Sequence, residues 1–166
     1  MGFFKKTPLD KNKTSQNTLG KSDILMCPEC SAVYYYKSWH HNLREYKELT
    51  DDKNVEFKLC PADIMKKHGL FEGLVSIENF PKHLKDEIIN QIHNITDHAF
   101  NRDPMDRLLE LHVTDNRAEV KTSENQLALS VARQVHKAHK NTELSTKLSK
   151  GDSVARARVW WPRGEE

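Results

Sequence analysis

The stretch GLFEGLVSIENFPKHLKDEIINQIHNITDHAF, residues 69–100, sets the fold class of this chain. Residues 69–78 are rich in apolar and β-compatible side chains, and a glycine and an asparagine flank them, which predicts a strand. In residues 81–100 the apolar side chains recur at spacings of four, four and three residues, which predicts a helix with one apolar face. These side chains are Leu84, Ile88, Ile92 and Ile95. A strand followed by an amphipathic helix indicates a mixed α and β domain.

A hairpin is predicted after this helix, and a last strand near the C-terminus. The segments 108–114 and 118–122 flank an Asp-Asn-Arg sequence at 115–117, which is a hairpin signature. The sequence VARARVWW at 154–161 alternates between two kinds of side chain, which predicts a strand. Residues 141–152 are polar, so we expect a connection that ends in a turn.

A second helix is predicted between the hairpin and the last strand. Ser123 and Gln126 have the spacing of a capping box, and the apolar side chains beyond them share one helical face. The order strand, helix, strand, strand, helix, strand is that of a ferredoxin-like βαββαβ domain, which we assign to residues 69–162. We therefore expect an α+β fold in which both helices cover one face of a four-stranded antiparallel sheet.

Residues 23–68 form a second predicted unit, which two short motifs bracket. CPEC supplies Cys27 and Cys30, and CPAD supplies Cys60 together with Asp63, which stands where a fourth cysteine is expected. A structural zinc site takes four ligands in a tetrahedron, and two tight turns that each donate two ligands satisfy this. So small a unit usually needs such a staple, because it buries little apolar area. We expect a zinc-ribbon-like unit in which these four residues bind Zn.

The fourth ligand is open at this stage. A carboxylate oxygen is a harder ligand than a thiolate and is uncommon in closed structural zinc sites. The spacing favours Asp63, but His40, His41 or His68 could complete the site, and so could a water molecule. The alternative is a metal-free unit in which the cysteines are small buried hydrophobic residues.

The last predicted strand carries the clearest candidate surface for nucleic acid. Arg156, Arg158 and Trp160 share one side of this strand, and small or apolar residues share the other. Because the apolar side should face the helices, these three side chains should lie on the open sheet face, where guanidinium groups bind phosphates and an indole stacks on a base. The other candidate contacts are Lys121, Arg133 and Lys137. The alternative is an ordinary solvated face in which glutamates balance the basic charge.

Composition and motifs limit the class of protein. The 166 residues have a formal net charge of +2 and contain no run of eighteen apolar residues, so no membrane span is expected. Residues 1–22 carry five lysines and one acid, which predicts a flexible basic tail. This segment lacks the apolar core of a secretory signal, so we expect a cytoplasmic protein, in which C-x-x-C favours metal binding over a disulfide.

No catalytic motif stands out in the sequence. A glycine-rich phosphate loop, G-x-S-x-G and H-E-x-x-H are all absent. A metal-dependent hydrolase would need an open coordination position with a base beside it. We therefore expect a protein that is not an enzyme.

Several motifs, taken in order, resemble one protein family. They are CPEC followed by SAVY, a tryptophan at position 39, CPAD, GLFEGLVSIENF, EIINQIHN, DPMDRLLEL and NQLALSVARQVHKAH. Over residues 25–161 the chain resembles bacterial relatives of the archaeal and eukaryotic export adaptor of the large ribosomal subunit, the family named for nonsense-mediated decay. That family has cysteine where this chain has Asp63, and usually glycine where this chain has Ser31.

The resemblance has consequences for cofactor and partner. In that family the cysteine pairs bind zinc, and the eukaryotic members dock on the large ribosomal subunit. The resemblance thus implies a non-catalytic, RNA- or ribosome-associated zinc protein. A protein-interaction or regulatory module is the alternative, and a small metal-dependent hydrolase is the third possibility.

Overall fold

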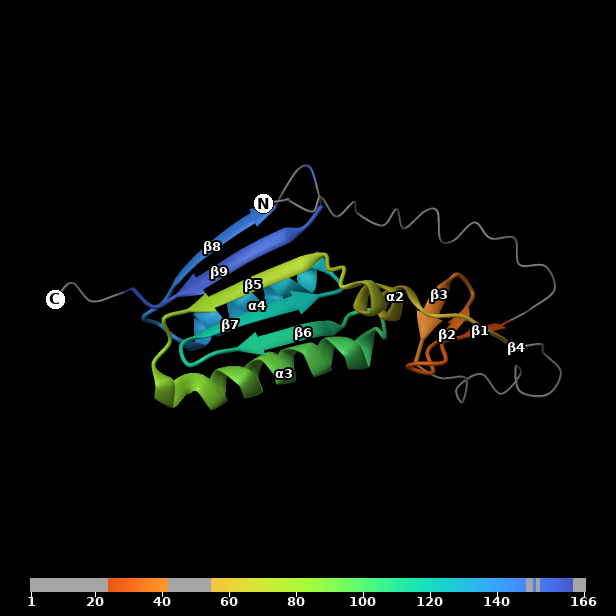
Figure 1. Ribbon diagram of the computed structural model, residues 1–166, viewed down its shortest axis with the longest axis horizontal. Helices are drawn as coiled ribbons and strands as arrows, with labels where there is room; N and C mark the ends of the chain where they lie inside the picture. Colours follow the sequence, from red (N-terminus) through yellow and green to blue (C-terminus); the bar gives the residue numbers. More distant parts are fainter. Residues whose placement is uncertain (1–23, 42–54, 149–150, 152, 163–166) are drawn as a thin grey trace.

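The computed structural model describes residues 24–41, 55–148, 151 and 153–162 (Figure 1). This part of the chain contains two β-sheets and three α-helices, so the expected α+β class is confirmed. The basic tail expected at residues 1–22 lies outside the described residues. Among the described helices, none combines the length and the apolar character that crossing a membrane requires.

A small four-stranded sheet comes first in the chain. Its strands are β1 (Ile24–Met26), β2 (Val33–Tyr35), β3 (Ser38–His40) and β4 (Val55–Phe57). The strand order is β3-β2-β1-β4, in which β1 pairs antiparallel with β2 and parallel with β4. Ile24 and Val33 are buried and form a small core with Met26 and Tyr35. Because this core is so small, the unit needs a further source of stability.

A short helix, α2 (Pro61–His68), follows the small sheet. Cys60 is its N-cap, and Pro61 occupies its first turn, where a missing N–H costs little. The helix ends at Gly69, whose φ of 61° lies in the left-handed region that glycine adopts readily. The sequence predicts a second tight turn at CPAD; the structure shows instead that this motif begins a helix.

The larger sheet has five strands. They are β5 (Gly73–Glu78), β6 (Leu108–Val113), β7 (Arg117–Thr122), β8 (Glu143–Leu148) and β9 (Ala155–Trp160). Their order is β6-β7-β5-β9-β8. A 3₁₀ turn, η2 (Lys82–Leu84), leads into α3 (Lys85–Arg102), which with α4 (Asn125–Ala138) lies on one side of the sheet and leaves the other face open (Figure 1).

The sequence missed β8, and this changes the topology. β8 is an edge strand with only two leucines, Leu144 and Leu148, and the second of these is 67% exposed. Its residues therefore lack the apolar alternation that signals a strand. β8 pairs antiparallel with β9 at the edge of the sheet, and β9 pairs parallel with β5. The expectation of four antiparallel strands is thus wrong in strand number and in the direction of the last strand.

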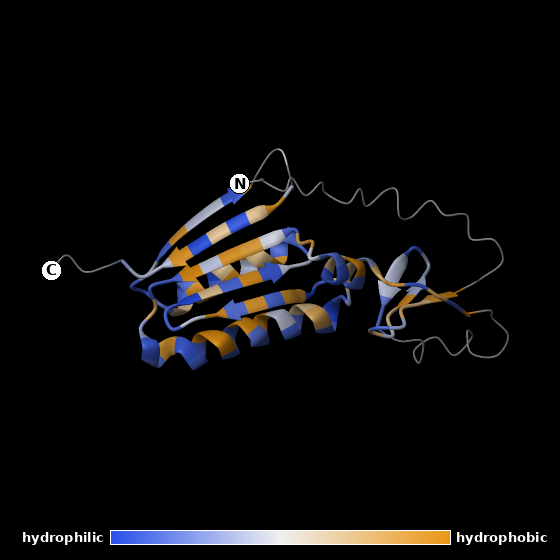
Figure 2. Ribbon diagram, in the orientation of Figure 1, coloured by the Kyte–Doolittle hydropathy of each residue, from blue (hydrophilic) through white to orange (hydrophobic). Residues whose placement is uncertain are grey.

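One continuous core joins the larger sheet to its helices. Apolar and polar residues alternate along the strands, visible as orange and blue stripes in Figure 2. The strands contribute Val75, Ile77, Ala118, Val120, Ala157 and Val159 to this core. The expected helix face is confirmed at Ile88, Ile92 and Ile95 in α3, and α4 contributes Leu127, Val131 and Val135. Burial of this apolar area provides the main stabilisation of the unit.

Candidate metal centre and basic surface

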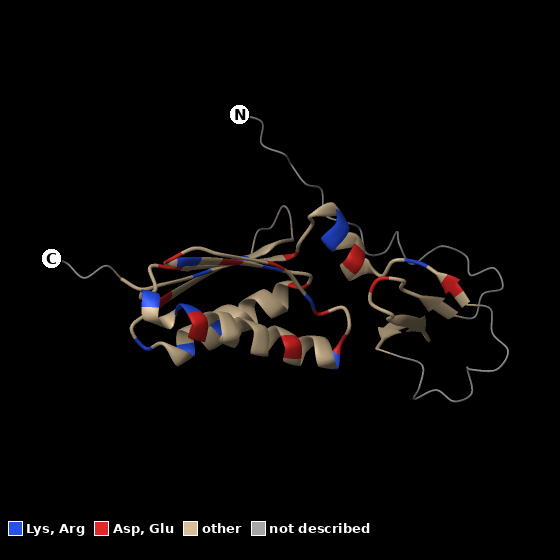
Figure 3. Ribbon diagram, turned by 60° about the horizontal axis from the view of Figure 1, so that its bottom comes forward, with Lys and Arg blue, Asp and Glu red and all other residues tan. Residues whose placement is uncertain are grey.

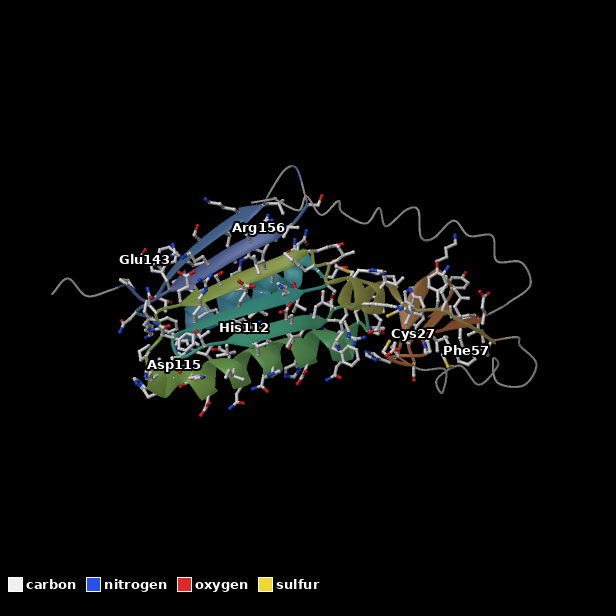
Figure 4. All side chains as sticks on the ribbon, in the orientation of Figure 1. Cys27, Phe57, His112, Asp115, Glu143 and Arg156 are labelled. Carbon is white, nitrogen blue, oxygen red and sulfur yellow. The ribbon has the colours of Figure 1, made fainter. Side chains whose placement is uncertain are left out.

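Four side chains from the two CPxx motifs meet in one cluster. One ligand atom each from Cys27, Cys30, Cys60 and Asp63 lies within 4.8 Å of all the others. Within the ranges that the structure describes, this is the one group of three or more His, Cys, Asp and Glu residues that could hold a metal ion. The cluster lies where the small sheet meets α2, and Cys27 marks its position in Figure 4.

The first motif is held by a tight turn at the end of β1. The backbone N–H of Cys27 donates to the Ala32 carbonyl (2.8 Å), and the N–H of Ser31 donates to the Cys27 carbonyl (2.9 Å). Ser31 has a φ of 60°, a left-handed conformation in which glycine is the unstrained residue. This turn brings Cys30 back toward Cys27.

The second motif is held by the N-terminus of α2. The backbone N–H of Asp63 donates to Cys60 Sγ (3.4 Å), so the thiol caps the first turn. A cap at Cys60 places a side chain three residues later on the same side of the helix start. In a zinc knuckle a tight turn brings the two ligands together. Here the first turn of α2 brings Cys60 and Asp63 together.

The Asp63 carboxylate faces the sulfur atoms with one oxygen. Its Oδ2 accepts hydrogen bonds from Cys27 Sγ (3.2 Å) and Cys60 Sγ (3.1 Å), and Cys30 Sγ lies 3.7 Å from Cys60 Sγ. A tetrahedral zinc ion with its usual sulfur bonds holds sulfur atoms about 3.8 Å apart. The donor set and its spacing therefore fit a tetrahedral metal ion.

The pKa values of the carboxylate and of two thiols in the cluster shift in opposite directions. Burial raises the pKa of the Cys60 and Cys30 thiols. Burial also acts to raise the pKa of Asp63, but hydrogen bonds from the three thiols and the positive charge of Arg107 outweigh it, so this pKa lies below its usual value. Without metal, the carboxylate is thus the charged group beside the Cys30 and Cys60 thiols, and a metal ion must displace protons from these two thiols as it binds.

The histidines considered as fourth ligands lie elsewhere. His40 Nε2 is 2.9 Å from Ser38 Oγ, and His41 contacts the Phe100 carbonyl oxygen and the edge of its ring. His68 is exposed in the last turn of α2. The structure therefore brings Asp63, and none of these histidines, to the three cysteines.

Sequence reasoning missed Arg107, which lies directly behind the carboxylate. Arg107 Nη2 is 3.4 Å from Asp63 Oδ1, and its guanidinium lies over the Phe100 ring, 5.3 Å from the centroid. Met105, from the same loop, packs against the buried cysteines. No local pattern signals this residue, because it follows the DP sequence that ends α3.

The loop that carries Arg107 is fastened to the larger sheet by Ser123. The backbone N–H of Arg107 donates to Ser123 Oγ (2.7 Å), whose hydroxyl donates to the Met105 carbonyl. The capping box expected at Ser123 is therefore wrong: α4 has Glu124 as its N-cap and no side-chain cap hydrogen bond. The serine has a partner elsewhere, which a sequence pattern does not reveal.

The open face of the larger sheet carries part of the expected basic surface. Arg156, Arg158 and Trp160 project to this face, opposite the buried Ala155, Ala157 and Val159. Arg158 donates twice to Glu78 Oε2 (2.9 and 2.7 Å) and lies over the Trp160 ring at 4.9 Å. Glu78 therefore neutralises much of the charge at this end of the sheet.

The opposite end of the open face carries a second group of basic residues. Strand pairing places Lys147 of β8 opposite Arg156 of β9. Leu74 of β5 lies between Arg156 and Lys121 and is paired with both, so the three basic residues form one row across the sheet. Lys121 donates to Glu110 (2.7 Å) and lies 5.5 Å from the Phe71 ring centroid. We call Lys121, Arg156 and Lys147 the basic row. It lies at the start of β5, next to α2.

Two further sets of basic residues lie at different places. Lys66 and Lys67 are exposed in the last turn of α2, which rises on the open side of the sheet (Figure 3). Arg133 and Lys137 are exposed on α4, which covers the other side. The expected nucleic-acid contacts therefore do not form one surface.

No family model matches the chain, and no curated protein or solved structure matches it significantly.

Proposed function

We propose that this protein is a non-catalytic RNA-binding factor that associates with the large ribosomal subunit and carries a structural zinc ion. The observation that carries the RNA proposal is the basic row, in which Lys147, Arg156 and Lys121 cross the open sheet face. Such a row can contact successive phosphates of one strand. Lys66 and Lys67 of α2 extend the positive charge toward the metal unit.

The zinc proposal follows from the donor set. Three sulfur atoms and one carboxylate oxygen lie close together, three of the four residues buried and Cys30 partly buried, and such a set suits a borderline-soft ion that accepts tetrahedral coordination. Cys27 is 1% and Cys60 0% exposed, so substrate has no direct access to them. We therefore interpret residues 23–68 as a zinc ribbon, and residues 69–162 as a variant of the ferredoxin-like arrangement in which β9 lies between β5 and the edge strand β8 and runs parallel to β5. The bound ion would cross-link the turn after β1 to the start of α2.

Sedimentation with ribosomes tests the RNA proposal. Purified protein is run with ribosomal subunits on sucrose gradients at low and moderate salt. We expect association with the large subunit that weakens as salt rises, because each phosphate contact releases a counterion. The paired change Lys147→Glu with Arg156→Glu should lower the affinity at least about tenfold and flatten the salt dependence.

A matched control separates a surface from net charge. Arg133→Glu with Lys137→Glu makes the same change in total charge on α4, away from the basic row. We expect this pair to retain most of the association. Equal losses in the two pairs would mean that binding depends only on net charge, and protein that stays at the top of every gradient would refute ribosome association.

A protein partner is the second proposal, and one observation favours it. Tyr36, in the turn between β2 and β3, is 86% exposed, and Phe57 of β4 is 67% exposed. Exposed aromatic side chains are common in protein interfaces. Tyr36→Ser with Phe57→Ser should abolish binding to a protein partner and leave binding to naked ribosomal RNA unchanged. The opposite result would favour RNA alone.

A further inference from the structure

The Asp63 carboxylate is held from two directions. Its Oδ2 faces the thiols of Cys27 and Cys60, and its Oδ1 faces Arg107 Nη2 at 3.4 Å. The side chains of Asp63 and Arg107 are only 8% and 18% exposed, so solvent screens this ion pair weakly. A carboxylate with both oxygens engaged cannot rotate freely, and only Oδ2 is then presented to the cysteines.

Packing around Arg107, rather than a chance surface contact, sets its position. Phe100 lies beneath the guanidinium, and Ser123 binds the Arg107 backbone on both sides, with Arg107 N–H donating to Ser123 Oγ and Ser123 N–H donating to the Arg107 carbonyl. Arg107 Nη1 is buried and has no hydrogen-bond partner among the described residues. A buried donor without a partner is unfavourable, so the surrounding contacts must impose this orientation.

The position of the Arg107 guanidinium matters for the charge balance of the metal centre. Three thiolates and one carboxylate around a divalent ion leave an excess of two negative charges in a buried site. The guanidinium of Arg107 offsets one of them through the ligand it touches. Residues that orient and hydrogen-bond a ligand in this manner commonly raise metal affinity about 10- to 100-fold.

We propose that Arg107 is a positioning residue of the metal centre: it holds Asp63 so that Oδ2 alone faces the ion, and it compensates the charge of this unusual fourth ligand. The inference rests on the proposed metal function. It also places a determinant of metal affinity outside the metal unit, because Arg107 belongs to the loop that leads into β6 and is anchored by the larger sheet.

The test is a double-mutant cycle with Co²⁺ and Zn²⁺. Arg107→Met, which keeps the apolar stem and removes the charge, is made in the native chain and in an Asp63→Cys chain. Metal affinity is measured by chelator competition, and the ligand field is followed by the absorption bands of bound Co²⁺. In the native chain Arg107→Met should lower the affinity about 10- to 100-fold and shift the Co²⁺ bands. In the Asp63→Cys chain the same change should lower the affinity less than about threefold, because the carboxylate is gone.

Each outcome decides a different point. Equal losses in both chains would show that Arg107 only supports the fold, and no loss in the native chain would also overturn the proposal. If Arg107→Met fails to fold by circular dichroism, Arg107→Lys replaces it, with a smaller loss expected because the charge remains. A native chain that binds neither ion would refute the metal function itself, whereas binding that ignores Arg107 would refute only its positioning role.

Discussion

At the scale of single residues, the metal centre depends on side chains with two functions. Cys60 is a candidate ligand and also the N-cap of α2, and Asp63 faces the sulfurs with one oxygen and Arg107 with the other. Ser31 adopts a left-handed backbone that favours glycine, so some strain is accepted within the first motif. These double roles explain how three cysteines and one aspartate can meet in so small a unit.

Ser123 gives the first prediction at this scale. Ser123→Ala leaves the part-buried N–H of Arg107 without the hydroxyl of the buried Ser123 as its acceptor, so the free energy of unfolding should fall by about 1–3 kcal/mol. Urea denaturation followed by circular dichroism measures this change. Ser130→Ala is the matched control, because Ser130 Oγ accepts an exposed hydrogen bond from the Gln134 side chain on the surface of α4. The control should change stability by less than about 0.5 kcal/mol, and a similar loss in both variants would refute the role of Ser123.

At the scale of elements, local pattern and tertiary contact contribute unequally. The two long helices were predictable because their apolar residues repeat with helical spacing. β5 was predictable from its β-compatible residues, β7 from the hairpin signature before it, and β9 from its alternating side chains. β8 was not, since its pairing with β9, rather than its own side chains, makes it a strand. The predicted capping box is wrong because the Ser123 side chain bonds to the backbone of the loop that carries Met105 and Arg107.

The close approach of α4 to β5 gives a prediction at this scale. A Cβ atom at Gly73 would lie 2.3 Å from Thr122 Oγ1 and 2.4 Å from Ala128 Cβ. Gly73→Ala must therefore push α4 away from the sheet, and it should cost about 1–3 kcal/mol. Thermal and urea unfolding measure the loss. Gly151→Ala is the control, because nothing lies within 4 Å of the added atom. If both variants were equally stable, the tight packing at Gly73 would be disproved.

At the scale of the whole molecule, two units have separate cores. The small unit packs around Cys27, Ala32, Cys60 and Ala62, whereas the larger sheet and its helices have a continuous apolar core of their own. Arg107, Met105 and the contact of His41 with Phe100 connect the units. We therefore expect metal to stabilise the first unit far more than the second.

Metal removal tests this division. A chelator should lower the unfolding temperature of the small unit and leave the helical transition nearly unchanged, because a ligand stabilises only the state that binds it, by about 4 kcal/mol at a thousandfold excess over Kd. Trp39 reports the small unit, since it packs on the cysteine cluster. Its fluorescence is isolated by Trp160→Phe with Trp161→Phe, and circular dichroism reports the helices. Two transitions that shift together would contradict the division, and readdition of Zn²⁺ is the control.

The sequence alone determined the features that repeat over short distances: the amphipathic helices, the alternating strands, the α+β class and the two motifs whose spacing pairs Cys27 with Cys30 and Cys60 with Asp63. Only the tertiary structure decided that Arg107 stands behind Asp63, that β8 completes the sheet, and that the basic residues divide between two sides. The physical reason is the distance along the chain over which each interaction acts. Periodicity and capping act within a few residues, whereas an ion pair or an edge-strand pairing exists only after distant segments have packed together.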